Sequence, residues 1–415
     1  MYELIKELFP ICRSITGNGV RETLKILRCH IPLKMMEVPT GTKVFDWEIP
    51  QEWNVKDAYV LDPAGKKIID FKKNNLHLVG YSVPINKIVT LAELQEHLHS
   101  LPKQPEAIPY VTSYYEKKWG FCLAHQDRKK LKAGNYQVMI DSQLKNGSLT
   151  YGEMIIPGQS KKEVFLSTYI CHPGMANNEL SGPAVVTFLA KWILAAPRKY
   201  TYRIIFIPET IGSITYLSRH LRAMKKNMLV GFNISCVGDE RNYSYVSTRN
   251  GNTYADKVVR YAFESLGKNF TAYSFLERGS DERQYNSPGV DLPVVSVSRS
   301  KYGTYPEYHT SLDNLSLVTP TGLGDSLELL KNILEIVEKN RCYRNALLCE
   351  PQLGRRGLYP TTSQKGSADE AKRILDFLAY ADGNNDLVDI SRKIGAPLPD
   401  LVSLAERLSA EKLIS

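Results

Sequence analysis

The sequence predicts an α/β fold in which a mixed, mainly parallel sheet carries helices on both faces. From about residue 160 to 340, short runs rich in β-forming apolar residues alternate with longer amphipathic runs, as in parallel sheets. Residues ~37–118 instead carry scattered Pro, Trp and Tyr with short β-like runs, and three short helical patterns end the chain. We therefore predict an α/β main domain over 1–36 and 119–350, a β-rich insertion over 37–118 and a winged-helix-like module over 367–415.

Each element has its own sequence signal. A first helix is predicted over 2–13, and β-like runs mark the insertion at 57–63 and 65–71. Two antiparallel strands, 136–143 and 148–158, are expected to return to the main sheet. Buried strands are then predicted at 163–171, 201–209, 229–237 and 292–300, and helices at 181–196, 211–224, 252–267 and 319–340. A linker is expected over 353–366, before the three terminal helices.

The composition is that of an ordinary globular protein, with 415 residues, 43% hydrophobic and 23% charged. No apolar run approaches the ~20 residues that a membrane-spanning helix needs, and the N-terminus does not resemble a signal peptide. The seven cysteines include no CxxC pair, so neither a disulfide framework nor a cysteine zinc site is indicated. We expect a cytoplasmic protein that does not associate with membranes.

The net charge of +9 does not form a nucleic-acid motif. Basic residues are scattered in short pairs such as Lys66–Lys67 and Lys129–Lys130, without a continuous stripe. The C-terminal helices suggest a winged helix or helix-turn-helix. However, from Ser367 onward there are six Lys or Arg and nine Asp or Glu, and basic contacts supply most of the affinity for phosphates. We therefore predict that this module contacts protein rather than nucleic acid.

Side chains that could bind a metal flank the predicted strands. In open parallel sheets, ligands bind beyond the carboxyl ends of the strands. The candidates at this edge are His172, Glu209, Asp239, Glu240, Asp281, Glu282, Glu307, His309 and Asp313. Two histidines with several carboxylates suit a zinc site that keeps one position open for water.

Each candidate also has a purely structural interpretation. A lone histidine such as His172 is more often a hydrogen-bonded core or surface residue. Glu209 could complement the dipole of the helix that follows it. Asp281 and Glu282 could pair with neighbouring arginines. The convergence of all these residues on one sheet edge favours the metal site.

Three segments carry a resemblance to a known family. CHPGMANNELSG before an apolar helix, PETIGS after the second strand and YHTSLDN after the fourth resemble motifs of co-catalytic zinc aminopeptidases. With SDERQY and PEYHTS, the whole arrangement resembles a bacterial family of aminopeptidase-like proteins that have an inserted β domain and a C-terminal winged helix. Members are often linked to polysaccharide biosynthesis loci. The resemblance covers nearly the entire chain.

The resemblance implies roles for matching residues. His172 and His309 match the two histidine ligands, and Glu209 matches the general base. Catalysis would then be metal-assisted hydrolysis of an amide.

The chain departs from the family pattern at three ligand positions. Asn178 stands where an aspartate bridges two zincs, and Thr210 and Ser235 stand in place of two carboxylates. Because neutral side chains hold two cations poorly, we expect one Zn²⁺ per chain. Its third ligand would be Asp281 or Glu179, with Asn178 as a further neutral ligand.

The remaining roles follow from this arrangement. Glu209, or Glu282 if Glu209 only caps a helix, would take the proton of the attacking water and return it to the leaving amine. Asp313 is expected to orient His309, with Glu179 also available outside the ligand set, and Glu307 or Asp281 to pair with a substrate amine. Three tyrosines could line the pocket or stabilise the oxyanion: Tyr285, Tyr305 and Tyr308.

The expected substrate is a small peptide or amide, and a homo-oligomer is possible. Three alternatives stay open. One is a deacylase or amidohydrolase that acts on a sugar precursor. The second is a binding or assembly protein of polysaccharide biosynthesis that has lost catalysis. The third is a DNA-binding regulator, which the acidic C-terminus disfavours.

Overall fold

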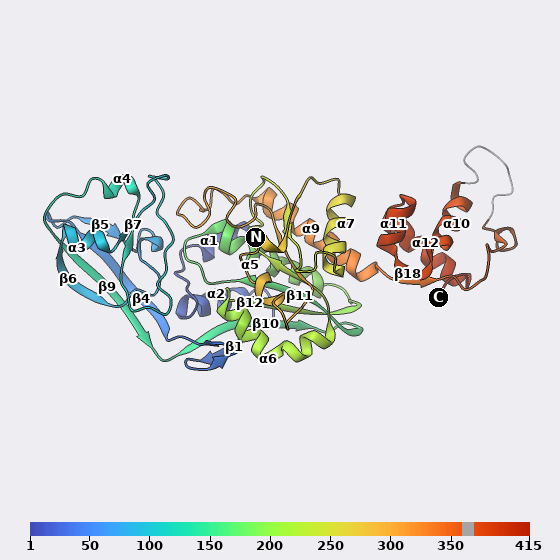
Figure 1. The fold of residues 1–415 in the computed structure, drawn as a ribbon, viewed down its shortest axis with the longest axis horizontal. Coiled ribbons are helices and arrows are strands. Elements are labelled where there is room, and N and C mark those ends of the chain that lie inside the picture. Colours follow the sequence, from blue (N-terminus) through green and yellow to red (C-terminus); the bar gives the residue numbers. More distant parts are fainter. Residues whose placement is uncertain (359–368) are drawn as a thin grey trace. The chain divides into compact units, whose positions relative to one another are not determined.

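The computed structural model describes residues 1–358 and 369–415, which form two compact units. The first contains Met1–Asp256 and Asn269–Leu330, and the second contains Lys257–Lys268 and Lys331–Ser415. An eight-stranded mixed sheet with flanking helices forms the centre of the first unit (Figure 1). The predicted α/β class is therefore confirmed.

The strand order explains why the sheet is mixed. It runs β1-β10-β12-β11-β13-β16-β14-β15. The four central strands are parallel. On one side β1 and β10 pair antiparallel with their neighbours, and on the other β14 pairs antiparallel with β16 and parallel with β15. The bounds are β1 (Lys34–Pro39), β10 (Ser148–Ile156), β11 (Ser160–Tyr169), β12 (Tyr200–Ile207), β13 (Met228–Ile234), β14 (Ser244–Val246), β15 (Thr271–Tyr273) and β16 (Val294–Ser298).

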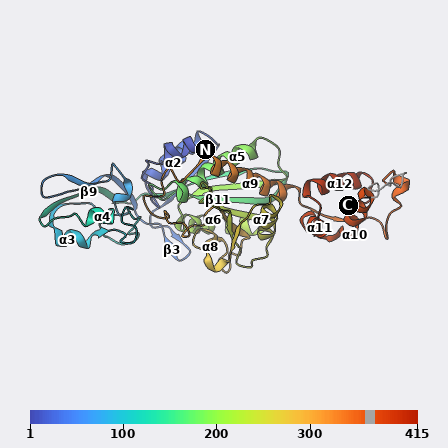
Figure 2. The same ribbon diagram turned by 90° about the horizontal axis from the view of Figure 1, so that it is seen from above.

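Helices α5 (Ser181–Leu194) and α6 (Ile211–Asn227) cover opposite faces of this sheet (Figure 1). The central strands are consequently apolar along their length, as expected for strands buried on both faces. Helix α1 (Tyr2–Leu8) packs on α5, and α2 (Asn18–Arg28) packs on β10. The short α8 (Glu282–Tyr285) lies beside α6 (Figure 2). The remaining long helices are α7 (Tyr254–Ser265) and α9 (Pro320–Lys339).

The sheet brings the candidate residues to one edge. Tyr169 at the end of β11 pairs in parallel register with Ile207 at the end of β12. The loops that carry His172 and Glu209 therefore start side by side. Three non-glycine residues in the edge loops have left-handed backbone angles, with φ of 64° at Thr210, 53° at Cys236 and 56° at His309. Such conformations cost free energy and are concentrated at functional sites.

The inserted domain extends further along the chain than the sequence indicated. Its four-stranded sheet has the order β5-β4-β9-β6, with β4 (Glu52–Leu61), β5 (Lys67–Asp70), β6 (Ile85–Thr90) and β9 (Asn135–Lys145). The segment 136–143, expected in the main sheet, pairs instead with β4 along its length. Its alternating burial suits a strand with one covered face, whereas β10 is buried almost throughout and does join the main sheet.

Short elements complete the insertion. They are two-stranded pairs of β2 (Lys43–Val44) with β3 (Trp47–Glu48) and β7 (Leu98–His99) with β8 (Phe121–Cys122), and helices α3 (Leu91–Glu96) and α4 (His125–Arg128).

The second unit contains the winged-helix module. Helices α10 (Asp369–Tyr380), α11 (Leu387–Ile394) and α12 (Leu398–Ala410) bury an apolar core that includes Phe377 and Leu401. Strand β18 (Asp382–Asp386) pairs with β17 (Cys342–Arg344), so the module begins before the predicted residue 367. Part of the predicted linker, 359–366, lies outside the described residues. In the described part of the chain, no helix has the length and apolarity needed to cross a bilayer.

Candidate active site

A cavity of about 480 Å³ lies at the carboxyl edge of the main sheet, where the inserted domain meets it. Three of the predicted site residues, His172, Glu209 and His309, line it together. The other lining residues are Ile15, Trp47, Tyr110, Thr112, Tyr114, Tyr115, Cys171, Thr210, Ile211 and Arg283.

The insertion fixes the loop that carries His309. The amide of Tyr110 donates to the carbonyl of His309 at 2.9 Å, and Pro109 forms an antiparallel bridge with Thr310. The ring of Tyr110 also stands edge-on to both His172 and His309, with centroids 5.2 and 5.1 Å away. The insertion therefore forms part of the cavity wall and positions one of its histidines.

The two histidine rings are close enough to share an ion. Their centroids are 5.3 Å apart, and two imidazoles bound to one tetrahedral ion place their centroids about 5 Å apart. The Nε2 atom of His309 is buried without a hydrogen-bond partner among the described residues. Burial, and then the charge of His172, lower the pKa of His309 to about 3. The ring is therefore neutral, which is the form that binds metals.

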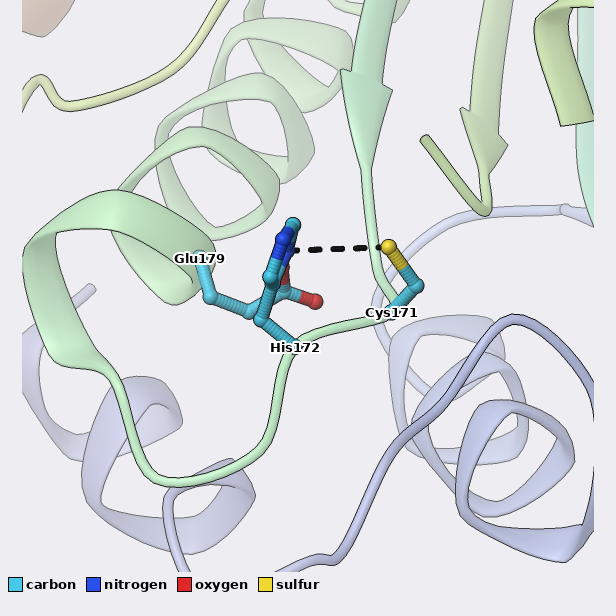
Figure 3. A group of neighbouring side chains, drawn as sticks. All are labelled: Cys171, His172 and Glu179. Atoms are coloured by element: carbon cyan, nitrogen blue, oxygen red, sulfur yellow. Dashed lines mark hydrogen bonds and ion pairs between the residues drawn. The ribbon is translucent and has the colours of Figure 1, made fainter. Parts of the chain in front are cut away.

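His172 is oriented by a buried acid (Figure 3). Its Nδ1 hydrogen-bonds Oε2 of Glu179 at 2.8 Å, and the other oxygen of Glu179 lies 3.5 Å from Nε of the buried Arg13. Burial disfavours the imidazolium, but Cys171 and Glu179 outweigh burial and raise the pKa of His172. Because Nδ1 is occupied, Nε2 is the ring atom available for a ligand, and it lies 3.7 Å from Oε2 of Glu209.

Cys171, His172 and Glu179 form the only close group of three potential metal ligands among the described His, Cys, Asp and Glu residues. A cation inside this group would have to break the bond from His172 to Glu179 and approach Arg13. Burial also raises the pKa of Cys171 to about 11, so its sulfur is a neutral thiol. This sulfur accepts the amide hydrogen of Glu209 at 3.2 Å. The group thus positions His172 and Glu209, and leaves the Nε2 side of His172 facing the cavity.

Glu209 follows the end of β12 and has one engaged oxygen. Oε1 accepts the hydroxyl hydrogen of Ser280 at 2.7 Å. Burial raises the pKa of Glu209, although the neighbouring His172 acts to lower it. A carboxylate with a raised pKa is a stronger base than an ordinary glutamate, and Oε2 is the oxygen that Ser280 leaves available to accept a proton.

The structure does not bring Asp281 or Glu282 to the histidines. Asp281 lies beneath Thr210, where its Oδ1 accepts from the Thr210 amide at 2.8 Å and from the Ser213 hydroxyl at 2.7 Å. Glu282 is fully buried and binds the amides of Gly279 and Ser280 and the hydroxyl of Tyr302. Neither residue lines the cavity. Both instead stabilise the loops around the site through hydrogen bonds.

Asp313 was expected to orient His309, but its carboxylate contacts the π-helical turn η2 (Ala176–Leu180) instead. Its carboxylate accepts from the amides of Ala176, Asn177 and Asn178 at 3.1, 2.6 and 2.9 Å. Such turns occur often at functional sites, and this one carries both Asn178 and Glu179. Burial raises the pKa of Asp313 to about 6.

The last two predicted site residues, Asn178 and Glu307, differ in whether their oxygens are already hydrogen-bonded. Asn178 donates to the hydroxyl of Tyr169 at 2.8 Å, and its buried Oδ1 has no hydrogen-bond partner among the described residues. Asn178 is not among the residues that line the cavity. Glu307 pairs with Arg241 through contacts of 2.7 and 2.8 Å and does not line the cavity.

The tyrosines of the cavity are not those expected. Tyr285 bonds Ser167 in the core and Tyr305 donates to Asp313, while Tyr308 stacks on His309 at 3.9 Å. Tyr110 and Tyr114 line the cavity, with their hydroxyls 3.0 Å apart. The aromatic run YVTSYYE (110–116) was the available signal. Arg13, Cys171 and Arg283 gave no distinctive pattern.

The comparisons with known proteins agree with this architecture. A family model described as Domain of unknown function (DUF4910) matches residues 2–340, and a winged helix-turn-helix model matches 341–415. A Clostridium acetobutylicum protein is 47% identical over 418 residues, which cover all of this chain and 95% of that protein. It is named as a proposed polysaccharide biosynthesis protein with an aminopeptidase-like domain.

Solved structures give the same result. A proposed peptidase from Clostridium acetobutylicum superposes with a TM-score of 0.93 at 46% identity, covering 100% of this chain and 95% of that one. A zinc aminopeptidase from Bacillus subtilis shares the fold, with a TM-score of 0.58 at 15% identity over 81% of this chain and 93% of its own. The chain therefore belongs to the DUF4910 family, whose main domain here has the aminopeptidase fold and is followed by a winged helix.

Proposed function

We propose that the protein is a metal-dependent amidohydrolase that cleaves an amide in the cavity at the sheet edge. The observation that carries this proposal is the pair of facing imidazoles, with ring centroids 5.3 Å apart, beside the partly free carboxylate of Glu209. The aminopeptidase fold and the zinc aminopeptidase named among its structural relatives are consistent with it. A reducing cytoplasm is our proposed location, since all seven cysteines are free.

The donor set fits one divalent cation better than two. His172 and His309 would hold it through their Nε2 atoms, and Asn178 offers an unpartnered oxygen. Thr210 and Ser235 supply no carboxylate for a second ion. The hydroxyl of Thr210 also accepts a hydrogen bond from the guanidinium of Arg283, whose positive charge would repel a second cation.

Residues of this chain would transfer the proton, orient the histidine and close the cavity. When bound, a divalent cation supplies Lewis acidity, which makes water easier to deprotonate and polarises the amide carbonyl. Glu209 would take the water proton at Oε2, the oxygen that Ser280 leaves free, and return it to the departing nitrogen. Glu179 keeps Nδ1 of His172 engaged, so Nε2 faces the site. Tyr110 and Tyr114 close the cavity from the insertion.

Metal analysis tests the proposal directly. We expect about one zinc per chain by elemental analysis of the untagged full-length protein. His172→Ala and His309→Ala should each lose the metal and the activity, whereas Glu209→Gln should keep the metal and lose turnover. His125→Ala, at a histidine that does not line the cavity, is the matched control. Two zincs would overturn the single-ion site, and activity in Glu209→Gln would move the base elsewhere.

A second candidate function is a binding or assembly protein that has lost catalysis, as the name of the Clostridium relative permits. Neutral side chains at positions 178, 210 and 235 favour it. Its signature would be protein that contains no zinc and has no hydrolytic activity, even after incubation with divalent cations.

A further inference from the structure

The cavity contains a guanidinium that forms no direct ion pair among the described residues, although it lies close enough to Glu209 and Asp281 that its charge acts, against burial, to lower the pKa of both. Arg283 lines it together with His172, Glu209 and His309. One terminal nitrogen of Arg283 donates to the hydroxyl of Thr210, and its Nε is buried with no hydrogen-bond partner in the described part of the chain. No acid among the described residues lies within ion-pair distance of it. An anion that entered the cavity would satisfy this donor and neutralise its charge.

The cavity offers nothing equivalent to a substrate cation. Glu209 is the only carboxylate among its lining residues, and it is the proposed base. Asp281 binds the Thr210 amide through Oδ1, Glu282 binds the amide of Ser280, and neither acid lines the cavity; Glu307 pairs with Arg241. A free amino terminus would therefore find no spare acid, while a carboxylate would find Arg283. Charge complementarity points to an anionic substrate.

We propose that the site hydrolyses N-acylated amino acids, and that Arg283 binds the free carboxylate next to the scissile amide. This inference rests on the proposed amide hydrolysis. Water adds its oxygen to the acyl carbon as the C–N bond breaks, and the nitrogen leaves with a proton passed on by Glu209. The products are a carboxylic acid and a free amino acid. The planar guanidinium suits this role because it can bind both carboxylate oxygens at once.

The aromatic residues of the cavity wall favour an apolar or ring-containing acyl group. Trp47 and Tyr115 lie edge to face with centroids 5.9 Å apart. They are 40% and 54% exposed, which is unusual for such large rings outside a binding surface. Both line the cavity with Tyr110 and Tyr114.

Three matched compounds test the proposal. N-acetyl-L-alanine has the carboxylate, N-acetyl-L-alaninamide lacks its charge, and L-alaninamide has a free amine instead. We expect zinc-loaded wild-type protein to cleave the first with kcat/KM about 100-fold above the other two, the effect of a charge-assisted pair. Arg283→Gln should lose this preference, and Arg283→Lys should recover part of it. Arg241→Gln, whose guanidinium lies outside the cavity, is the control.

Binding to the Glu209→Gln variant separates this inference from the proposed function. Tighter binding of N-acetyl-L-alanine than of its amide, measured by calorimetry and abolished by adding Arg283→Gln, supports the carboxylate site even if no compound is cleaved. In that case only the hydrolase proposal fails. Two results would overturn the inference. One is a preference for L-alaninamide. The other is a preference for N-acetyl-L-alanine over N-acetyl-L-alaninamide that Arg283→Gln and Arg283→Lys both leave unchanged.

Discussion

At the scale of single residues, the buried carboxyl of Asp281 makes stability depend on pH. Burial, and then the charge of Glu209, raise its pKa from 3.8 to about 7. Between these two values the folded protein binds a proton that the unfolded chain releases. Stability from this group is therefore greatest below the unfolded pKa and is lost as pH rises through the folded pKa.

Asp281→Asn should remove this dependence. An amide oxygen can still accept from Thr210 and Ser213, but no charge is buried at high pH. Relative to wild type, we expect the variant to gain about 2–4 kcal/mol as pH rises from 4.5 to 8, measured by urea unfolding. Asp127→Asn, at an exposed position, is the control. If the difference in unfolding free energy between the variant and wild type stays constant with pH, Asp281 is not the group that makes stability depend on pH.

Glu179 is the second residue with a strong expected effect. It serves both His172 and the fully buried Arg13. Glu179→Gln leaves Arg13 without a counter-charge, and breaking a buried pair in this way costs about 3–5 kcal/mol. Urea unfolding should show this loss, whereas Glu93→Gln, which breaks an exposed pair with Lys87, should cost less than about 1 kcal/mol. Equal losses of unfolding free energy in the two variants would mean that Glu179 is not needed as the counter-charge of Arg13.

Sequence patterns located the residues that directly follow strands. His172 and Glu209 come within three residues of a strand end, so the parallel topology alone brings them together. Asp281 and Asp313 lie in loops and Glu282 begins the short helix α8, so their hydrogen-bond partners decide their roles. Asp281 and Asp313 bind backbone amides of distant segments, and Glu282 binds amides of its own loop. No periodicity in the sequence predicts these partners.

At the scale of elements, the π-helical turn η2 depends on one distant carboxylate. Asp313 accepts from three consecutive amides of this turn, which then presents Asn178 and Glu179. Asp313→Ala would leave the buried amides of Asn177 and Asn178 unsatisfied, at a cost of about 3 kcal/mol or more, while the amide of Ala176 keeps its bond to the carbonyl of residue 313. We expect lower stability in urea and weaker zinc binding by competition with a chelator. Asp325→Ala, at a half-exposed carboxylate outside the turn, is the comparison, and unchanged zinc affinity in Asp313→Ala would contradict the role.

The long, periodic elements were predictable, and the insertion boundary was not. Helices α5, α6 and α9 start within one residue of their predicted positions, because apolar periodicity over three or more turns is a strong signal. Strands β9 and β10 are adjacent in sequence and similar in pattern, yet they belong to different sheets. Only their long-range partners, β4 and β12, distinguish them.

At the scale of the whole molecule, basic and acidic residues are unevenly distributed. The chain carries a net charge of +9, although its last 49 residues contain six basic and nine acidic side chains. In the winged helix, the basic residues Arg407 and Arg392 pair with Glu370 and Glu264. Over residues 341–415, which the winged helix-turn-helix model matches, eleven basic and ten acidic side chains nearly cancel, so the module has little excess positive charge to meet phosphate.

The full-length protein should therefore bind DNA only weakly through the winged helix. A protein that neutralises several phosphates loses affinity steeply with salt, because each contact releases a counterion. We expect no shift of duplex DNA in gels at about 150 mM salt, and any shift at low salt to be unchanged by Arg407→Ala, which lies on α12. A retained, sequence-dependent shift at 150 mM that Arg407→Ala abolishes would show that this module reads DNA. If variants of the scattered lysine pairs lose the gel shift at low salt, the weak DNA affinity comes from the surface outside the winged helix.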